Sequence, residues 1–250
     1  MARPGLAEWE LVGVALVVGS FLGVVIARLP DGLSALAGRS RCATCDTVLA
    51  VRDLVPLASW LAARGRCRHC GARLGWFYPA VELAALAIAL ISVALDRGID
   101  AWVDAMLGWW LLALGWIDWR RFVLPDLLTW PLVPLGLVAG WALAPEELPD
   151  RVLGAVFGYL ALWAVARLYR RLRGREGLGL GDAKLLAAAG AWVGASGLPS
   201  VVAGAALAGL AVAGLLRLAG RRFDRHSALP FGPFLAAAAW LVWLFGPLGT

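Results

Sequence analysis

No charged side chain interrupts residues 185–216, which read LLAAAGAWVGASGLPSVVAGAALAGLAVAGLL. A helix needs about 20 apolar residues to cross the hydrocarbon core of a bilayer, so these 32 residues are too many for one crossing. The sequence Gly-Leu-Pro-Ser at 197–200 supplies turn-forming residues near the middle of the stretch. We therefore predict two membrane-spanning helices here, at 184–195 and 200–216, with a break at 197–200.

The rest of the chain has the same apolar character. Of its 250 residues, 61% are hydrophobic and 16% are charged, whereas soluble domains are closer to half apolar and a quarter charged. Further apolar stretches lie at 11–27, 77–95, 101–117, 127–145, 152–166 and 229–248. Together they predict an all-α polytopic membrane protein of about eight transmembrane helices, and they exclude a soluble globule and a disordered chain.

Basic residues are unevenly distributed among the segments that connect these helices. The segments 28–78, 118–126, 167–184 and 217–226, which would share one side of the membrane, hold 20 of the 23 Arg and Lys residues. Cytoplasmic loops are enriched in Arg and Lys, so this side is predicted to be cytoplasmic and both termini periplasmic. The sequence pI of 9.8 then follows from topology, and we expect membrane lipids rather than nucleic acid as the partners of these arginines.

All four cysteines lie in the longest hydrophilic segment, as Cys42-Ala-Thr-Cys45 and Cys67-Arg-His-Cys70. Two such pairs, 21 residues apart, suit a tetrahedral zinc site to which each pair supplies two thiolates. Disulfide or redox chemistry and unliganded thiols are the alternatives, but a cytoplasmic loop keeps its thiols reduced. His69 is a further possible ligand, which we interpret as a bystander. After a first transmembrane helix at 1–29, we predict a small cytoplasmic zinc-binding loop domain over residues 30–76.

Two aspartates stand at the predicted cytoplasmic ends of separate helices. Asp118 follows the helix at 101–117, and Asp182 precedes the helix at 184–195. Two carboxylates at one depth cannot both ionise cheaply, so one holds a proton while the other acts as a base. Such a pair can activate water and protonate a leaving amine, as peptide hydrolysis requires. Structural roles remain open: Asp182 as a helix cap, and Asp118 as a partner of a neighbouring arginine.

Other residues near these helices also have more than one interpretation. Gly179 and Gly181 allow a backbone to approach the site closely. Asp126 follows Pro125 and is predicted chiefly as the N-cap of the helix at 127–145. Lys184 either extends toward lipid headgroups or tunes the aspartate pair. Glu82, inside the helix at 77–95, is either a partner for a loop arginine or part of a ligand site.

Several ordered motifs resemble those of the type IV prepilin leader peptidase/N-methyltransferase family, which are membrane aspartic proteases of the GxGD class. The resemblance extends from about residue 19 to 235. Beside the cysteine pairs and the segment from Asp118 to Asp126, it includes GSFLGVVIARLP at 19–30, YPAVEL at 78–83, GLGDAK at 179–184 and LPFGPF at 229–234. It implies that residues 77–250 form a peptidase core of about seven helices with Asp118 and Asp182 as the catalytic aspartates. Its supporting residues would be Gly179, Gly181, Lys184, Asp126 and Glu82.

The resemblance further implies an inner-membrane enzyme that removes the leader peptide of type IV prepilins or pseudopilins on the cytoplasmic side. It also implies methylation of the new amino terminus, with S-adenosylmethionine as the donor. Gly23 departs from the family pattern, in which Asn is usual, and this departure bears on methyl transfer more than on proteolysis. From the residues alone, the alternatives are a transporter with intramembrane carboxylates and a cytoplasmic zinc module, or a non-catalytic membrane scaffold.

Overall fold

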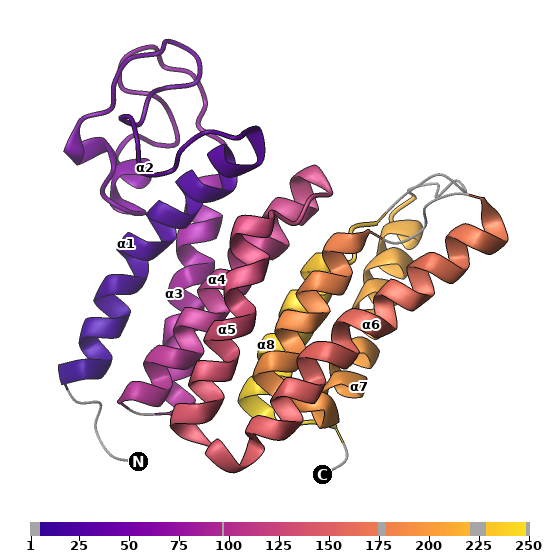
Figure 1. The fold of residues 1–250 in the computed structure, drawn as a ribbon. Helices are drawn as coiled ribbons and strands as arrows, with labels where there is room; N and C mark the ends of the chain where they lie inside the picture. The colour runs from indigo at the N-terminus through magenta and orange to yellow at the C-terminus, as the bar shows by residue number, and fades with distance from the viewer. Residues whose placement is uncertain (1–5, 97, 175–178, 221–228, 249–250) are drawn as a thin grey trace. The chain divides into compact units, whose positions relative to one another are not determined.

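The computed structural model describes residues 6–96, 98–174, 179–220 and 229–248. Within these ranges the regular structure is helical, and the only strand-like pairings are two isolated bridges. The helices are α1 (Leu6–Arg28), α2 (Ala58–Ala62), α3 (Phe77–Leu95), α4 (Ile99–Arg121), α5 (Asp126–Leu143), α6 (Leu148–Arg173), α7 (Leu180–Leu218) and α8 (Gly232–Phe245) (Figure 1). The prediction of an all-α protein is confirmed.

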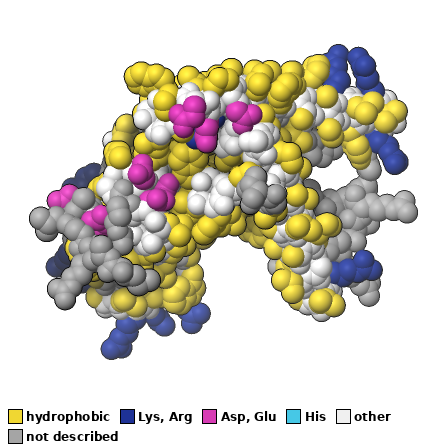
Figure 2. All heavy atoms as spheres, turned by 90° about the horizontal axis from the view of Figure 1, so that it is seen from below, with side chains coloured by type: hydrophobic (Ala, Val, Ile, Leu, Met, Phe, Trp, Pro, Cys, Tyr) yellow, Lys and Arg dark blue, Asp and Glu magenta, His cyan; other side chains and the backbone are white. Residues whose placement is uncertain are grey.

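Five of the described helices, α1, α3, α5, α6 and α7, are long and apolar enough to cross a membrane. The predicted number of eight is therefore not confirmed. Hydrophobic side chains cover much of the surface visible in Figure 2, with acidic side chains gathered on the same face. On α6, Leu153, Phe157 and Leu160 are exposed at the i, i+4, i+7 spacing of one helix face, which fits contact with lipid.

The chain forms two compact units, Met1–Trp109 and Trp110–Thr250, and the boundary falls within α4. In the first unit, α1 packs against α3 through Gly19, where a Cβ would lie 2.8 Å from the Cα of Glu82. Trp109 joins the first half of α4 to α3 by donating its indole N–H to the carbonyl of Ala85 at 2.9 Å. The cysteine-bearing loop connects α1 to α3 and belongs to this unit.

In the second unit, α6 and α7 pack with their backbones in close contact. A side chain at Gly154 of α6 or at Gly190 of α7 would collide with the backbone of the other helix. A Cβ at Gly158 would lie 2.5 Å from the carbonyl oxygen of Leu186. Small residues at such positions let membrane helices approach each other. The close contact with α6 stabilises the part of α7 that begins at Leu180.

The long α7 is interrupted at Gly194, which has φ 75° and ψ 172°. The segment before the break packs on α6, while the segment after it packs on α8, with Gly197 near Val242 and Gly209 near Phe234. The chain therefore reverses direction at the break. The sequence prediction of a break was right, but its position at 197–200 was wrong, because only Gly194 adopts a positive φ there.

Asp150 of α6 stabilises the start of the second segment of α7. Its Oδ2 accepts hydrogen bonds from the Oγ of Ser196 at 2.9 Å and from the backbone N–H of Ser196 at 3.3 Å. The first amides of a helix have no acceptor within the helix, so a carboxylate supplied from another helix acts as a cap. Pro199 lies close to this start, where the loss of one backbone donor costs little.

Candidate active site and metal centre

The four cysteines converge on one point, as the sequence spacing predicts. Their Sγ atoms all lie within 4.8 Å of one another, and those of Cys42 and Cys70 are 3.9 Å apart. Sulfur ligands bound about 2.3 Å from zinc would be roughly 3.8 Å apart at the corners of a tetrahedron. All four are free thiols, which does not support the disulfide alternative, and His69 is not part of the cluster. The cluster therefore fits a four-coordinate metal ion.

Each cysteine pair sits in the same kind of turn. The N–H of Cys42 donates to the carbonyl of Thr47, and the N–H of Cys67 donates to the carbonyl of Ala72. Both turns need a positive φ at the residue after the second cysteine, 53° at Asp46 and 70° at Gly71. The two turns form a structural repeat that also shows in the sequence, where RSRCATCDTVL at 39–49 and RGRCRHCGARL at 64–74 share two arginines, both cysteines and a leucine.

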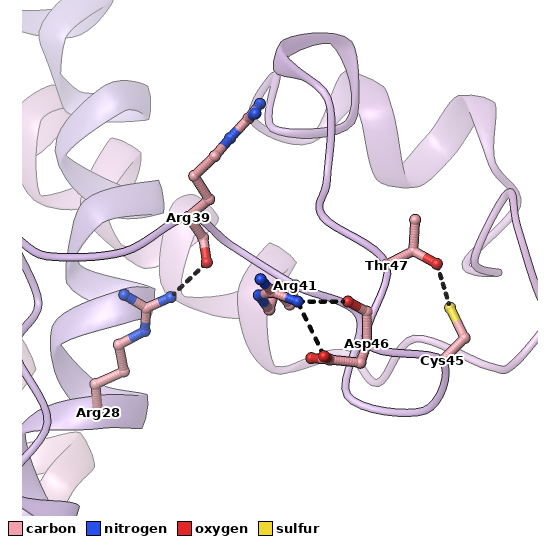
Figure 3. A network of polar contacts seen from close by, with 6 residues as sticks. All are labelled: Arg28, Arg39, Arg41, Cys45, Asp46 and Thr47. Carbon is pink, nitrogen blue, oxygen red and sulfur yellow. Dashed lines mark hydrogen bonds and ion pairs between the residues drawn. The ribbon is translucent and has the colours of Figure 1, made fainter.

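Polar contacts fix the first turn and tie it to α1 (Figure 3). The guanidinium of Arg41 donates to both the carbonyl and the carboxylate of Asp46. Arg28, the last residue of α1, donates to the carbonyl of Arg39 at 3.2 Å. These contacts hold the turn that carries Cys42 and Cys45 at the end of α1 without a contribution from a bound metal ion.

Backbone amides in these turns point at the sulfur atoms. Hydrogen bonds from the amides of Cys45 and Thr44 lower the pKa of the Cys42 thiol, and those from Cys70 and His69 lower the pKa of the Cys67 thiol. At Cys70 the amide of Ala72 also lowers the pKa, but partial desolvation and the neighbouring thiols outweigh it and raise the pKa to about 11. Four thiolates this close repel each other, and a divalent cation offsets that repulsion.

Glu82 of α3 holds the loop by its backbone. Its side chain is buried, and its Oε2 accepts a hydrogen bond from the N–H of Leu57 at 2.8 Å. Leu57 has φ 56° and ψ −50°, a conformation that residues with a Cβ rarely adopt. Of the two interpretations of Glu82, the partner for a loop arginine is wrong, because the carboxylate is bound to this strained backbone amide. A part in a ligand site stays a prediction. Four residues earlier, Asp53 lies 3.1 Å from the guanidinium of Arg68 in the second cysteine turn.

Replacing Glu82 by Ala is expected to loosen this loop without removing a metal ligand. A hydrogen bond to a buried charged group contributes about 1.5–3 kcal/mol, so the loop should open at least about tenfold more often. Brief digestion with trypsin, which would cut at exposed loop arginines such as Arg52 and Arg64, measures this opening. Glu82→Gln keeps an acceptor oxygen and should be cut more slowly than Glu82→Ala; equal rates for the wild type and Glu82→Ala would contradict this role.

The departure at Gly23 is matched by a neighbouring side chain. A Cβ at Gly23 would lie 2.7 Å from the ring of Tyr78. The space in which an Asn side chain would extend from α1 is therefore occupied by an aromatic ring from α3. Because the ring of Tyr78 fills this space, the change at position 23 does not leave an empty site.

Asp118 and Asp182 lie close enough for their charges to interact. Asp118 is in the last turn of α4 and is buried, whereas Asp182 is in the first turn of α7 and is half-buried. Because α7 begins at Leu180 with Gly179 as its N-cap, Asp182 is the third helical residue, and its carboxyl group accepts a hydrogen bond from the backbone of Gly179. A capping contribution of Asp182 is therefore compatible with its place in the pair. Two segments far apart in the sequence thus bring two carboxyl groups together, which is the arrangement that acid–base chemistry requires.

Gly232, at the start of α8, is a third component of this site and had no role assigned from the sequence. Its N–H donates to Oδ2 of Asp118 at 3.0 Å, and a Cβ at Gly232 would lie 2.6 Å from the same oxygen. One turn before Asp118, a Cβ at Gly115 would lie 3.3 Å from the Cα of Pro233. The available signal was a glycine beside a helix-starting proline, where amides lack helical acceptors.

Asp126 and Lys184 form an ion pair between the first turns of α5 and α7. Asp126 is the first residue of α5, and the N-cap position is held by Pro125. The prediction of Asp126 as an N-cap is therefore wrong, because its carboxylate binds Lys184 instead. The ammonium of Lys184 is correspondingly paired rather than extended alone toward headgroups.

The two glycines before Asp182 differ in how closely they are packed. A Cβ on Gly181 would lie 3.0 Å from the Cβ of Leu124. Gly179 has more room, with the nearest atom 3.8 Å from a Cβ placed there.

Comparison with known proteins agrees with these features. Residues 13–95 match the family described as the bacterial peptidase A24 N-terminal domain, and residues 105–214 match the type IV leader peptidase family. The first match contains the cysteine cluster and Glu82, and the second contains Asp118, Asp126, Asp182 and Lys184. No solved structure matches the chain.

Several curated proteins named prepilin leader peptidase/N-methyltransferase are similar along nearly the whole chain. The protein of Burkholderia pseudomallei (strain K96243) is 42% identical over 259 residues, covering 93% of this chain and 84% of that protein. Those of Aeromonas salmonicida (strain A449) and Pseudomonas aeruginosa PAO1 are 37% and 39% identical, each covering 93% of this chain and 88% of the relative. The resemblance found in the sequence is confirmed, and the chain belongs to the type IV leader peptidase family.

Proposed function

We propose that this chain is a membrane aspartic endopeptidase that removes the leader peptide of type IV prepilins and methylates the new amino terminus. Relatives that match 93% of the chain bear both activities in their name. The observation that carries the proposal is the convergence of Asp118 and Asp182, with the Gly232 amide bound to one of them. The transporter alternative receives no support from these relatives.

The geometry suggests how the two carboxyl groups divide the work. The Gly232 N–H stabilises Asp118 as a hydrogen-bond acceptor, so Asp118 takes the proton of a bound water while the hydroxyl oxygen adds to the scissile carbonyl carbon. Asp182 holds the other proton and gives it to the substrate. Asp118 then passes the proton that it took from the water to the peptide nitrogen, and the carbon–nitrogen bond breaks. The products are a carboxylic acid and a free amine, and the proton that the collapsing diol loses returns to Asp182. The pair needs no covalent intermediate.

The cysteine loop and the methyl donor complete the proposal. Cys42, Cys45, Cys67 and Cys70 would hold a structural zinc ion, because four thiolates at tetrahedral spacing favour that metal. S-adenosylmethionine would supply an electrophilic methyl group to the amine that cleavage releases. In this division, residues 1–29 are a transmembrane helix, 30–76 the zinc-binding domain and 77–250 the peptidase core.

Charge distribution supports the orientation of this enzyme in the inner membrane. The segments that hold Asp118, Asp182 and the cysteines, together with segment 217–226, carry 20 of the 23 basic residues. This favours their placement in the cytoplasm with both termini in the periplasm. A prepilin or pseudopilin would then be cleaved at the cytoplasmic face while its apolar helix stays in the bilayer. Anionic lipids are the expected partners of the remaining arginines.

One assay tests both activities. The purified protein is incubated with a prepilin, with and without S-adenosylmethionine, and the product masses are measured. We expect loss of the leader in both reactions and the mass of one added methyl group only where the donor is present. An intact prepilin after prolonged incubation would contradict the peptidase, and a shortened but unmethylated product would contradict the methyltransferase.

Gly232→Ala is expected to slow cleavage by roughly 10- to 100-fold. The new Cβ would collide with the carboxylate of Asp118, and a displacement of about 1 Å in a catalytic group can cost 10²-fold. Initial cleavage rates at saturating prepilin measure the effect. Gly214→Ala is the matched control, because a Cβ at Gly214 meets nothing within 4 Å. A Gly232→Ala protein as fast as the control would remove Gly232 from the site.

A further inference from the structure

The short segment between α4 and α5 is fastened to the first turn of α7 at two points. Leu124 lies against Gly181, where a Cβ would be 3.0 Å from the Leu124 side chain. Asp126 forms its ion pair with Lys184, whose ammonium also lies 6.0 Å above the ring of Trp130 in α5. We call these four residues, Leu124, Asp126, Gly181 and Lys184, the clamp.

The clamp lies close to both aspartates along the chain. Asp182 lies between Gly181 and Lys184, and Asp118 lies six residues before Leu124. The segment that links Asp118 to the clamp is short, and Phe122 continues the helical hydrogen bonding of α4 by donating its N–H to the carbonyl of Asp118. Pro125 has its φ fixed by its ring. If the contacts between the two sides of the clamp loosen, the carboxyl group of Asp182 therefore moves relative to that of Asp118.

The ion pair is poorly suited to a role in stability alone. The side chains of Lys184 and Asp126 are 21% and 62% exposed, and partly exposed ion pairs contribute little to the free energy of unfolding. A catalytic carboxyl pair, by contrast, is sensitive to displacements too small to unfold the protein. We therefore expect this ion pair to affect the distance between the two carboxyl groups more than the free energy of unfolding.

We propose that Asp126 and Lys184 are positioning residues whose ion pair holds Asp182 at its working distance from Asp118. This inference rests on the proposed peptidase function. Neither residue acts on the substrate. Lys184 fixes the first turn of α7 through Asp126, and the carboxyl group of Asp182 follows. The contact of Leu124 with Gly181 prevents the same turn from sliding along α5.

A double-mutant cycle on prepilin cleavage tests the inference. The variants are Asp126→Asn, Lys184→Met, the two combined, and Lys184→Arg, which keeps a cation at this position. We expect each single variant to lower kcat by about 10- to 100-fold with little change in KM. The double variant should be no slower than either single variant, because residues that act through each other are not additive. Lys184→Arg should recover most of the rate.

Arg167→Met is the matched control, since the Arg167 guanidinium also lies over a tryptophan ring, 5.9 Å from Trp163. It should cleave at the wild-type rate. Multiplicative losses in the double variant would mean that Lys184 acts directly and would overturn the inference. A fall in the amount of folded protein with unchanged kcat per folded molecule would overturn it in favour of a purely structural role. A wild-type protein that leaves prepilin intact would overturn the proposed function, and with it this inference.

Discussion

Asp182→Asn is expected to abolish leader cleavage while the protein remains folded in the membrane. An amide has nearly the shape of a carboxyl group but cannot hold or release the proton that the mechanism needs. General acid–base catalysis by one group contributes about 10²–10⁴-fold, so cleavage should fall at least about 100-fold and approach the limit of detection. Mass measurement of the prepilin after a long incubation checks this. Asp118→Asn should behave in the same way.

The combined variant distinguishes a shared mechanism from two separate contributions. Because the two carboxyl groups act as one unit, Asp118→Asn with Asp182→Asn should cost about as much as either single change. Asp100→Asn is a suitable control, since Asp100 is exposed and lies in the first turn of α4, the helix that ends with Asp118. If Asp182→Asn cleaves near the wild-type rate, the assignment of a catalytic pair fails.

The convergence of Asp118 and Asp182 could be predicted because it depends on features that are local in the sequence. Each aspartate sits next to an apolar stretch, and charge asymmetry places both at the same predicted side of the membrane. The cysteine cluster was predictable for the same reason, since two Cys-x-x-Cys pairs specify a ligand set regardless of the path between them. Patterns of this kind report on residue type and spacing alone.

The errors concern partners that come from distant parts of the chain. Asp126 was expected to cap its own helix, but Lys184, 58 residues away, offers it a positive charge. Glu82 was interpreted either as a partner for a loop arginine or as part of a ligand site, and its carboxylate binds the amide of Leu57. The capping of Ser196 by Asp150 has the same origin. A side chain with several possible partners cannot be assigned from sequence, because tertiary packing decides which partner is near.

Loss of any one cysteine of the cluster is expected to release the metal and unfold the loop. The purified protein should contain about one zinc per chain, and Cys67→Ser should contain almost none, because the loop has little apolar core with which to hold three ligands in place. Elemental analysis of protein purified without added metal measures the content. His69→Ala should retain its zinc, since the imidazole lies outside the cluster.

The Cys67→Ser variant also separates the two proposed activities. The cysteines belong to the unit Met1–Trp109, and the aspartates belong to the unit Trp110–Thr250, so disorder in the loop need not reach the carboxyl pair. We expect Cys67→Ser to lose most methylation while leader cleavage stays within about tenfold of the wild-type rate, less than the loss expected from removing an acid–base group. Full methylation by a protein that lacks all four cysteines and contains no zinc would contradict a role for the cluster. Equal loss of both activities would instead mean that the loop shapes the peptidase site itself.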